Sequence, residues 1–172
     1  MKEAPRNMKQ VPGRMTRTRT HNGFTLIELL IVVAIIGIIA AIAIPNLLQA
    51  MDRAKQKKTM ADIKNLSTAI ESYAVDVNYY PISTSMAAIA TLGAANLGIE
   101  PIYIKAAPTK DGWAGALQYG SDTGGAGSDY TITSFGKDKK VSSSSAGITN
   151  DFDCDIIYQN GSFTAYPEGI QT

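Results

Sequence analysis

The 172-residue sequence is long enough for one globular domain of ordinary size with an accessory segment, but too short for two full domains. Its single cysteine excludes an intrachain disulfide, and its single histidine is His21. The rest of the chain therefore offers no imidazole for general base chemistry or metal ligation, which excludes most hydrolase designs.

The first 23 residues form a strongly basic segment. Six positive charges against one negative charge leave +5 in this segment. The remaining chain has ten basic and fourteen acidic residues, which leaves −4 instead of the formal +1 of the whole sequence. We therefore expect no nucleic-acid partner for a basic face. The basic residues of the segment are Lys2, Arg6, Lys9, Arg14, Arg17 and Arg19.

An apolar segment follows directly. Every residue from Leu29 to Ile44 is apolar or glycine, and the 21 residues that start at Phe24 are interrupted only by a threonine and a glutamate. As a helix they would extend about 32 Å, enough to cross a bilayer core of about 30 Å. Basic residues precede this segment and none follows before Arg53, so we expect the leader in the cytoplasm and the rest outside.

Two simpler interpretations of the apolar segment stay open. An ordinary secretory signal would be cleaved after Ala41-Ile42-Ala43, and a signal anchor would leave Glu28 at the membrane interface. The apolar run is longer than the usual signal core of about 7 to 15 residues, and it opens with an ionisable residue that a signal peptide does not need. A retained helix is therefore favoured.

From residue 49 to residue 77 the pattern becomes amphipathic. Apolar residues recur at steps of three and four, which predicts one helical stripe packed on a sheet. We expect one α-helix from about Phe24 to Val77, with an apolar membrane half over 24–48 and an amphipathic half over 49–77. Pro45 removes a backbone hydrogen bond and is expected to bend or locally melt this helix. The stripe consists of Ile63, Leu66, Ile70, Tyr73, Ala74 and Val77.

Residues 78–172 are rich in glycine, serine, threonine and aromatic residues, which predicts a β-rich globular head. The segment Asn78-Tyr79-Tyr80-Pro81 is expected to end the helix, and Asn160-Gly161 predicts a hairpin turn. The fold class is therefore α+β, with the long helix packed on a small antiparallel sheet. A short helix is expected near Met86–Leu92, and strands at Leu117–Tyr119, Tyr130–Phe135, Asp155–Gln159 and Ser162–Tyr166.

The sequence Gly23-Phe24-Thr25-Leu26-Ile27-Glu28 resembles the cleavage site of type IV prepilins and pseudopilins. The resemblance implies that a membrane prepilin peptidase cuts between Gly23 and Phe24 and methylates the new amine, so that residues 1–23 are a leader. It also implies that Pro45 is the kinking proline of these helices. Met1, Met8 and Met15 are three candidate starts, which would give leaders of 23, 16 or 9 residues.

Glu28 would be the glutamate at the fifth position of the mature chain. A lone carboxylate in lipid costs about 2.5 to 3.5 kcal/mol at the bilayer centre and less near an end, so it should seek a cation. The methylated amine of Phe24 in a neighbouring subunit is the expected partner. At about 4 Å and an effective dielectric constant near 20, this pair would gain about 4 kcal/mol before desolvation. Glu28 is therefore the predicted docking residue of a filament.

The head is similar to that of the major, G-type pseudopilins of type II secretion systems, and the similarity covers most of the chain. It is carried by the segments Tyr73–Pro81, Asp111–Gly115, Gln118-Tyr119 and Asp129–Asp138. The resemblance implies a pseudopilus subunit that drives protein secretion and has no enzymatic activity. The implied partners are further copies of the chain, the prepilin peptidase, an inner-membrane assembly platform, minor pseudopilins and membrane lipid. The implied location is the bacterial inner membrane, with a cytoplasmic leader and a periplasmic head and filament.

Calcium is the one cofactor that this resemblance implies, because the family binds it in the loop between its last two strands. The corresponding segment is 138–155, and calcium takes six to eight oxygen ligands. Asp138 and Asp155 are the expected ligands, with Asp151 and Asp153 as substitutes. Two departures weaken the match: Lys139 stands where glycine is usual, and Cys154 replaces one of two adjacent aspartates. A solvated acidic loop is the alternative.

Two rival functions stay open. A subunit of a surface type IV pilus, used for adhesion, motility or DNA uptake, would share the helix, but such pilins often close a C-terminal loop with a disulfide that a single cysteine cannot make. A membrane-anchored binding domain or enzyme that never polymerises would need a convergent polar site. The sequence shows no glycine-rich phosphate loop before a helix and no paired cysteines.

Overall fold

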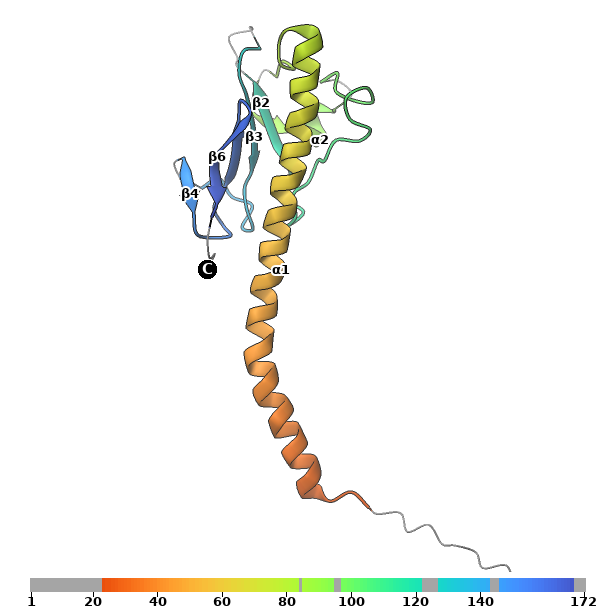
Figure 1. The fold of residues 1–172 in the computed structure, drawn as a ribbon, viewed down its shortest axis with the longest axis vertical. Coiled ribbons are helices and arrows are strands. Elements are labelled where there is room, and N and C mark those ends of the chain that lie inside the picture. Colours follow the sequence, from red (N-terminus) through yellow and green to blue (C-terminus); the bar gives the residue numbers. More distant parts are fainter. Residues whose placement is uncertain (1–22, 84, 95–96, 122–126, 143–145, 169–172) are drawn as a thin grey trace, which may run out of the picture. The chain divides into compact units, whose positions relative to one another are not determined.

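The computed structural model describes residues 23–83, 85–94, 97–121, 127–142 and 146–168 (Figure 1). It contains two compact units, Met1–Ala41 and Ile42–Thr172, and the helix α1 (Leu26–Val77) begins in the first and ends in the second. The predicted long helix is therefore confirmed, although it starts two residues later than expected. Apart from Gly23, the predicted leader lies outside the described residues.

In the first unit, the described part of α1 exposes its side chains on every side. Only Ala40 is half-buried, and the exposed residues are apolar or small apart from Glu28. The helix is long and apolar enough to cross a membrane, and none of its 18-residue window with a mean hydropathy of 3.1 is buried. This is the arrangement that the sequence predicts for a membrane half.

The helix continues without interruption through Pro45, which lies at the start of the second unit. Of the two expected effects of this proline, the structure shows no local melting. Proline removes only one backbone hydrogen bond, and the helical residues on both sides keep the neighbouring dihedral angles in place. The predicted bend stays a prediction.

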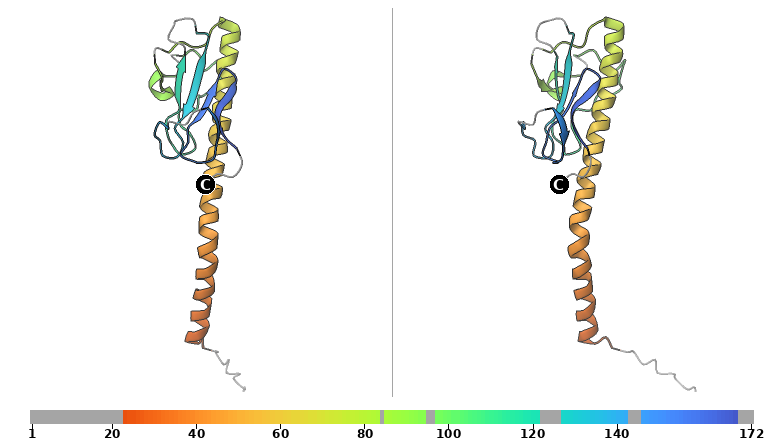
Figure 2. Two further views of the ribbon diagram at one scale, coloured as in Figure 1. Left: turned by 90° about the vertical axis from the view of Figure 1, so that its left-hand side faces the viewer. Right: turned by 60° about the vertical axis from the view of Figure 1, so that its left-hand side comes forward.

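In the second unit, α1 packs one stripe of side chains against the sheet of the head (Figure 2). Ile63, Leu66 and Ile70 are buried almost completely, in line with the predicted stripe. The helix ends as expected, because Asn78 adopts a left-handed φ of 68° and donates its N–H to the carbonyl oxygen of Ala74 at 2.8 Å. A left-handed residue directly after the last turn is a common helix terminator.

Among the described residues, one six-stranded sheet forms the head, in the order β1-β2-β3-β5-β6-β4. All neighbouring pairs are antiparallel except β4 and β6, which are parallel. Tyr119, Ile132 and Tyr158 are register partners on three successive strands and form the centre of the core. The strands are β1 (Ala87–Ala88), β2 (Gln118–Ser121), β3 (Tyr130–Ser134), β4 (Gly147–Thr149), β5 (Ile156–Gln159) and β6 (Ser162–Pro167).

The predicted α+β fold and its four strands are confirmed, with small shifts at their ends. The turn Asn160-Gly161 has positive φ at both residues, 46° and 91°, as a tight hairpin turn requires. Two strands were not expected. Strand β1 takes the first part of the predicted short helix, which shrinks to α2 (Ile89–Leu92), and β4 adds the parallel pair to a sheet that was expected to be antiparallel.

Candidate functional site

The predicted cleavage site lies in an exposed segment that precedes α1. Gly23, Phe24 and Thr25 have no regular secondary structure, and the side chain of Phe24 is 78% exposed. Among the described residues, no atom lies within 4 Å of the position that a Cβ atom of Gly23 would take. The peptide bond between Gly23 and Phe24 is therefore unobstructed by the described part of the chain.

Thr25 and Glu28 cap the first turn of α1 reciprocally. The backbone N–H and the hydroxyl of Thr25 donate to Glu28 Oε2 at 2.9 and 2.7 Å, and the N–H of Glu28 donates to Thr25 Oγ1 at 3.3 Å. This is a capping box, in which two otherwise unpaired backbone donors at the helix start are satisfied. Sequence reasoning missed it, although the Thr-x-x-Glu spacing before an apolar run was the signal.

The cap gives Glu28 a role within its own chain, besides the predicted pairing with a neighbouring subunit. Two donors from Thr25 converge on one carboxylate oxygen, so the first turn itself solvates part of the carboxylate. The cap also explains why α1 begins at Leu26, since Thr25 occupies the N-cap position. Phe24 and Gly23 are thereby kept outside the helix.

A second group of polar contacts joins α1 to the head, and sequence reasoning did not predict it. The indole N–H of Trp113 donates to Asp52 Oδ1 at 3.2 Å, and Lys137 Nζ lies 3.0 Å from Asp52 Oδ2. Lys55, one turn along the helix, approaches Asp52 at 3.8 Å. Burial alone would raise the pKa of Asp52, but the hydrogen bonds from Lys137 and Trp113 and the charges of Lys137 and Lys55 hold it below the usual range.

Backbone contact is closest where Gly112 meets the same stretch of helix. Its N–H donates to Thr59 Oγ1 at 2.9 Å, and the Thr59 hydroxyl donates in turn to the carbonyl oxygen of Lys55 at 3.0 Å. A Cβ atom on Gly112 would lie 2.3 Å from that carbonyl oxygen. Only glycine therefore fits this position without displacement of the backbone.

Asp111 organises the turn that carries Gly112 and Trp113. Its Oδ1 accepts the N–H groups of Trp113 and Gly115 at 2.9 and 2.7 Å, and its Oδ2 accepts the hydroxyl of Ser134 at 2.7 Å. Asp111 is only 4% exposed, so these donors take the place of water around its carboxyl group. The turn thereby presents the indole ring to α1.

Of the four aspartates in the predicted calcium loop, Asp155 is the buried one. Asp155 is buried and accepts the N–H of Ser142 at 3.2 and 3.1 Å on its two carboxylate oxygens, while its own N–H donates to Ser142 Oγ at 3.3 Å. Burial raises the pKa of Asp155, the charge of Asp138 adds to this effect, and the bonds from Ser142 oppose it. Asp138 and Asp155 therefore lie within electrostatic reach of each other.

The other two aspartates serve local turns. Asp151 Oδ1 accepts the N–H of Asp153 at 3.1 Å, and both side chains are exposed. In the part of the chain that the structure describes, no three His, Cys, Asp or Glu side chains gather as a metal site. The donor set thus suits calcium in kind, with two hard carboxylates, but most of its six to eight oxygens would have to come from backbone carbonyls or water.

The position of Lys139 explains one departure from the family pattern. Its φ is 59°, in the left-handed region where glycine is usual, and Asp138 Oδ1 accepts the N–H of Lys140 across this residue at 2.9 Å. The turn that glycine would form is therefore kept with a lysine in its place.

Comparisons with known proteins place the chain in a family. The family model described as "Type II secretion system (T2SS), protein G" matches residues 46–151, and the one described as "Prokaryotic N-terminal methylation motif" matches residues 18–44. The first match covers more than half of the sequence. The chain belongs to the type II secretion system protein G family.

Relatives of protein G agree over much of their length. The type II secretion system core protein G of Vibrio cholerae is 37% identical over 111 residues, which cover 61% of this chain and 74% of the relative. That of Escherichia coli K12 is 33% identical over 139 residues, which cover 77% of this chain and 86% of the relative. A type IV major pilin of Myxococcus xanthus is 50% identical over 68 residues, 39% of this chain and 31% of that pilin.

Membership in the protein G family confirms the predicted function of a structural pseudopilus subunit in type II secretion. The match to the methylation motif includes Gly23, Phe24 and Glu28 and implies processing by a prepilin peptidase. Together with the apolar α1, it identifies an inner-membrane-anchored protein. The match over 46–151 includes Asp52, Gly112, Trp113 and Lys137, so the contacts between α1 and the head lie within the family region.

Proposed function

We propose that the mature subunit begins at Phe24 and carries a methylated amine there. The observation that carries the proposal is the exposed, non-helical segment Gly23-Phe24-Thr25 directly before an apolar helix. Cleavage at this bond removes residues 1–23 with their net charge of +5 and leaves α1 attached. Glycine has no side chain to obstruct the peptidase.

Glu28 is proposed to act as the docking residue between subunits. Its carboxylate lies in the first turn of an apolar helix and is bonded only on one oxygen by the contacts with Thr25 described above. The methylated amine of a neighbouring Phe24 offers the cation that a carboxylate in a medium of low dielectric constant favours. Such a pair would favour one axial register over its mismatched alternatives.

The filament is proposed to grow in the periplasm from subunits that leave the inner membrane with their heads on that side. The basic leader supports this orientation, because positively charged segments stay in the cytoplasm. An inner-membrane assembly platform and minor pseudopilins are the proposed partners, and the proposed action is mechanical extrusion of secreted proteins, with no enzymatic step.

A structural calcium ion is proposed at Asp138 and Asp155, with Asp151 and Asp153 as secondary ligands. Support comes from the buried carboxylate of Asp155 and from the charge of Asp138 close to it. A bound dication would relieve the repulsion between the two carboxylates and would fix the loop between β3 and β5.

A second candidate function is a surface type IV pilus. It is supported by the 50% identity to the M. xanthus pilin, which exceeds the identity to the protein G relatives but covers only 68 residues. The two functions share cleavage, methylation and assembly through α1, so the tests of those steps apply to both.

The deciding experiment is intact-mass spectrometry of the protein expressed together with a prepilin peptidase. We expect a mature chain that starts at Phe24 and carries one additional methyl group. A chain that starts near Ile44 would identify an ordinary secretory signal, and an uncut leader would identify a signal anchor; either result would refute the proposal.

A further inference from the structure

Charge is strongly segregated along the chain after Gly23. Residues 53–58 hold four of the ten basic residues of this part and no acidic residue, whereas residues 59–172 hold six basic and twelve acidic residues. Within the described residues, Lys55 is the one cation of this segment that forms an ion pair, with Asp52. The other three, Arg53, Lys57 and Lys58, are here called the basic neck.

The basic neck is exposed and electrostatically uncompensated. All three of its side chains are exposed, and within the described residues none of them forms an ion pair. Asp52 is already engaged by Lys137, Lys55 and Trp113, and within the described residues Asp62, one turn after Lys58, forms no ion pair. Arg53 and Lys57 lie one turn apart on the same flank of α1 and repel each other. An anionic partner outside the subunit would reduce this repulsion.

The neck follows directly on the apolar surface of the helix. Within the second unit, the exposed apolar residues of α1 continue to Met51, two residues before Arg53. Measured from Met51, Arg53, Lys57 and Lys58 lie about 3, 9 and 10 Å further along the helix. The polar layer of a bilayer adds about 5 to 8 Å on each side of its core, and long basic side chains reach back towards it. The cations therefore fall where lipid phosphates are found.

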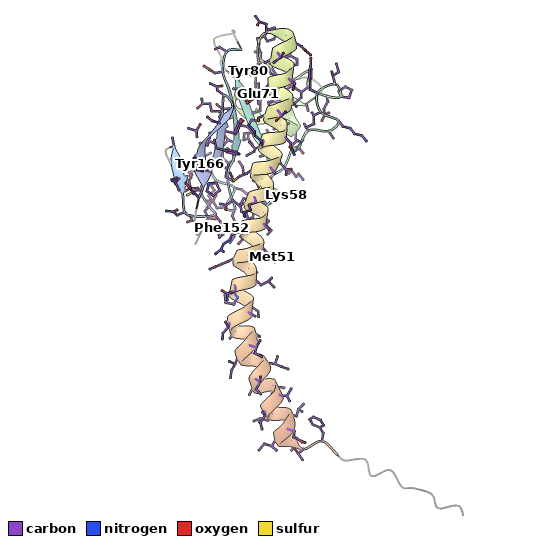
Figure 3. All side chains as sticks on the ribbon, viewed as in Figure 1. Met51, Lys58, Glu71, Tyr80, Phe152 and Tyr166 are labelled. Atoms are coloured by element: carbon purple, nitrogen blue, oxygen red, sulfur yellow. The ribbon has the colours of Figure 1, made fainter. Side chains whose placement is uncertain are left out.

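Figure 3 shows one end of the head beside the stretch of α1 that carries the basic neck. Phe152 lies level with the part of α1 between Met51 and Lys58, and the carbonyl oxygen of Phe152 accepts the N–H of Lys137, which binds Asp52. The neck thus lies beside this end of the head, directly after the exposed apolar residues Leu47, Leu48 and Met51 of the same unit.

We propose that the basic neck binds the phosphate groups of anionic phospholipids in the leaflet on the head side of the membrane. The inference rests on the proposed function, in which the subunit is anchored in the inner membrane before assembly. It names the class of lipid that the anchored subunit binds. Bound lipid would hold the subunit at a fixed depth before assembly, and its release would accompany extraction into the filament. Each basic residue at an anionic surface changes the affinity by about fivefold, and salt weakens the effect.

The test uses the mature chain, freed of its basic leader by the prepilin peptidase and reconstituted in phosphatidylcholine vesicles that contain spin-labelled phosphatidylglycerol or spin-labelled phosphatidylcholine. We expect electron spin resonance to show a preference of at least about fivefold for phosphatidylglycerol in low salt, which falls towards equality in 1 M salt. The variant Arg53→Gln/Lys57→Gln/Lys58→Gln should lose the preference, and the charge-conserving control Arg53→Lys/Lys57→Arg/Lys58→Arg should keep it.

Fluorescence of Trp113, the only tryptophan, reports whether each variant keeps the contact between α1 and the head. Equal binding of both lipids by the native chain would overturn the inference. So would a glutamine variant that keeps the preference but whose filaments dissociate, because the neck would then bind a second copy. A native chain that prefers phosphatidylglycerol but forms no filament would support the lipid contact and refute the filament function instead.

Discussion

Gly112 lies against the backbone of α1, and its replacement should be costly. In Gly112→Ala the new methyl group would collide with the carbonyl oxygen of Lys55, and the hydrogen bond from Gly112 to the buried Thr59 would be strained. Overpacking costs about 1 to 3 kcal/mol and a lost buried hydrogen bond about 1 kcal/mol. We expect a loss of about 3 kcal/mol in the free energy of unfolding, measured by urea titration in detergent with Trp113 fluorescence.

Ala114, two residues further on, supplies a matched control in the same turn. Its φ is 61°, in the left-handed region that costs an alanine about 1 to 2 kcal/mol. Ala114→Gly should therefore leave the free energy of unfolding equal or slightly higher, after the entropy cost of glycine. If both variants lose stability alike, the turn is merely sensitive to any change and the steric argument at Gly112 fails.

The lowered pKa of Asp52 makes the stability of the contact between α1 and the head depend on pH. Its pKa in the folded protein lies below the unfolded value of about 3.9, so the stability that it contributes is complete above that value. This contribution is lost as the pH falls through the lower, folded pKa. We expect Asp52→Asn to lose up to about 1 kcal/mol at pH 7 and to show a flatter stability profile below about pH 4.

The matched control is Asp62→Asn, which removes a half-buried acid of the same helix. Melting curves between pH 3 and pH 7 should show a smaller loss of stability in acid for Asp52→Asn than for the native chain. An unchanged acid limb in Asp52→Asn would mean that the contacts of Asp52 with Lys137 and Trp113 carry no pH-dependent stability.

At the scale of elements, the sequence predicted those with strong periodicity. The stripe on α1 and the hairpin of β5 and β6 are local patterns, and both are confirmed. Strand β4 was missed because it has three residues in a Ser/Gly-rich stretch, and it becomes a strand only through its parallel partner β6. Its pairing of Gly147 with Ala165 depends on the whole head, which no local window contains.

The loop between β3 and β5 is the element at which calcium should act. An ion bound only by the folded state, at one hundred times its dissociation constant, stabilises by about 2.7 kcal/mol, which raises the melting temperature by several degrees. We expect that rise when calcium replaces a chelator, and we expect its loss in Asp138→Asn and Asp155→Asn. Thermal melts of the full chain in detergent measure it.

Asp151→Asn/Asp153→Asn is the control for this experiment, because those side chains serve exposed turns. The double variant should keep most of the calcium response. If the native chain melts at the same temperature in calcium and in chelator, a structural ion is ruled out and the segment is a solvated acidic loop.

For the molecule as a whole, the candidate site was predictable to the extent that it is written in consecutive residues. One motif of six residues contains Gly23, Phe24 and Glu28, and it also contains the capping partner Thr25. The contact between Asp52 and Trp113 joins residues 61 positions apart, and only the packing of α1 on the sheet brings them together. No spacing in the sequence identifies such a pair.

Assembly of the whole filament can distinguish the two roles of Glu28. Glu28→Gln keeps an oxygen acceptor for the cap but has no charge, whereas Thr25→Ala removes the cap and leaves the charge. If the charge sets the register, Glu28→Gln should be cleaved normally yet reduce filament yield at least about tenfold, which needs a preference of only about 1.4 kcal/mol. Thr25→Ala should lose about 1 kcal/mol of helix stability and still assemble. Electron microscopy measures the filament yield of both variants. Normal assembly of Glu28→Gln with failed assembly of Thr25→Ala would assign Glu28 to the helix cap alone.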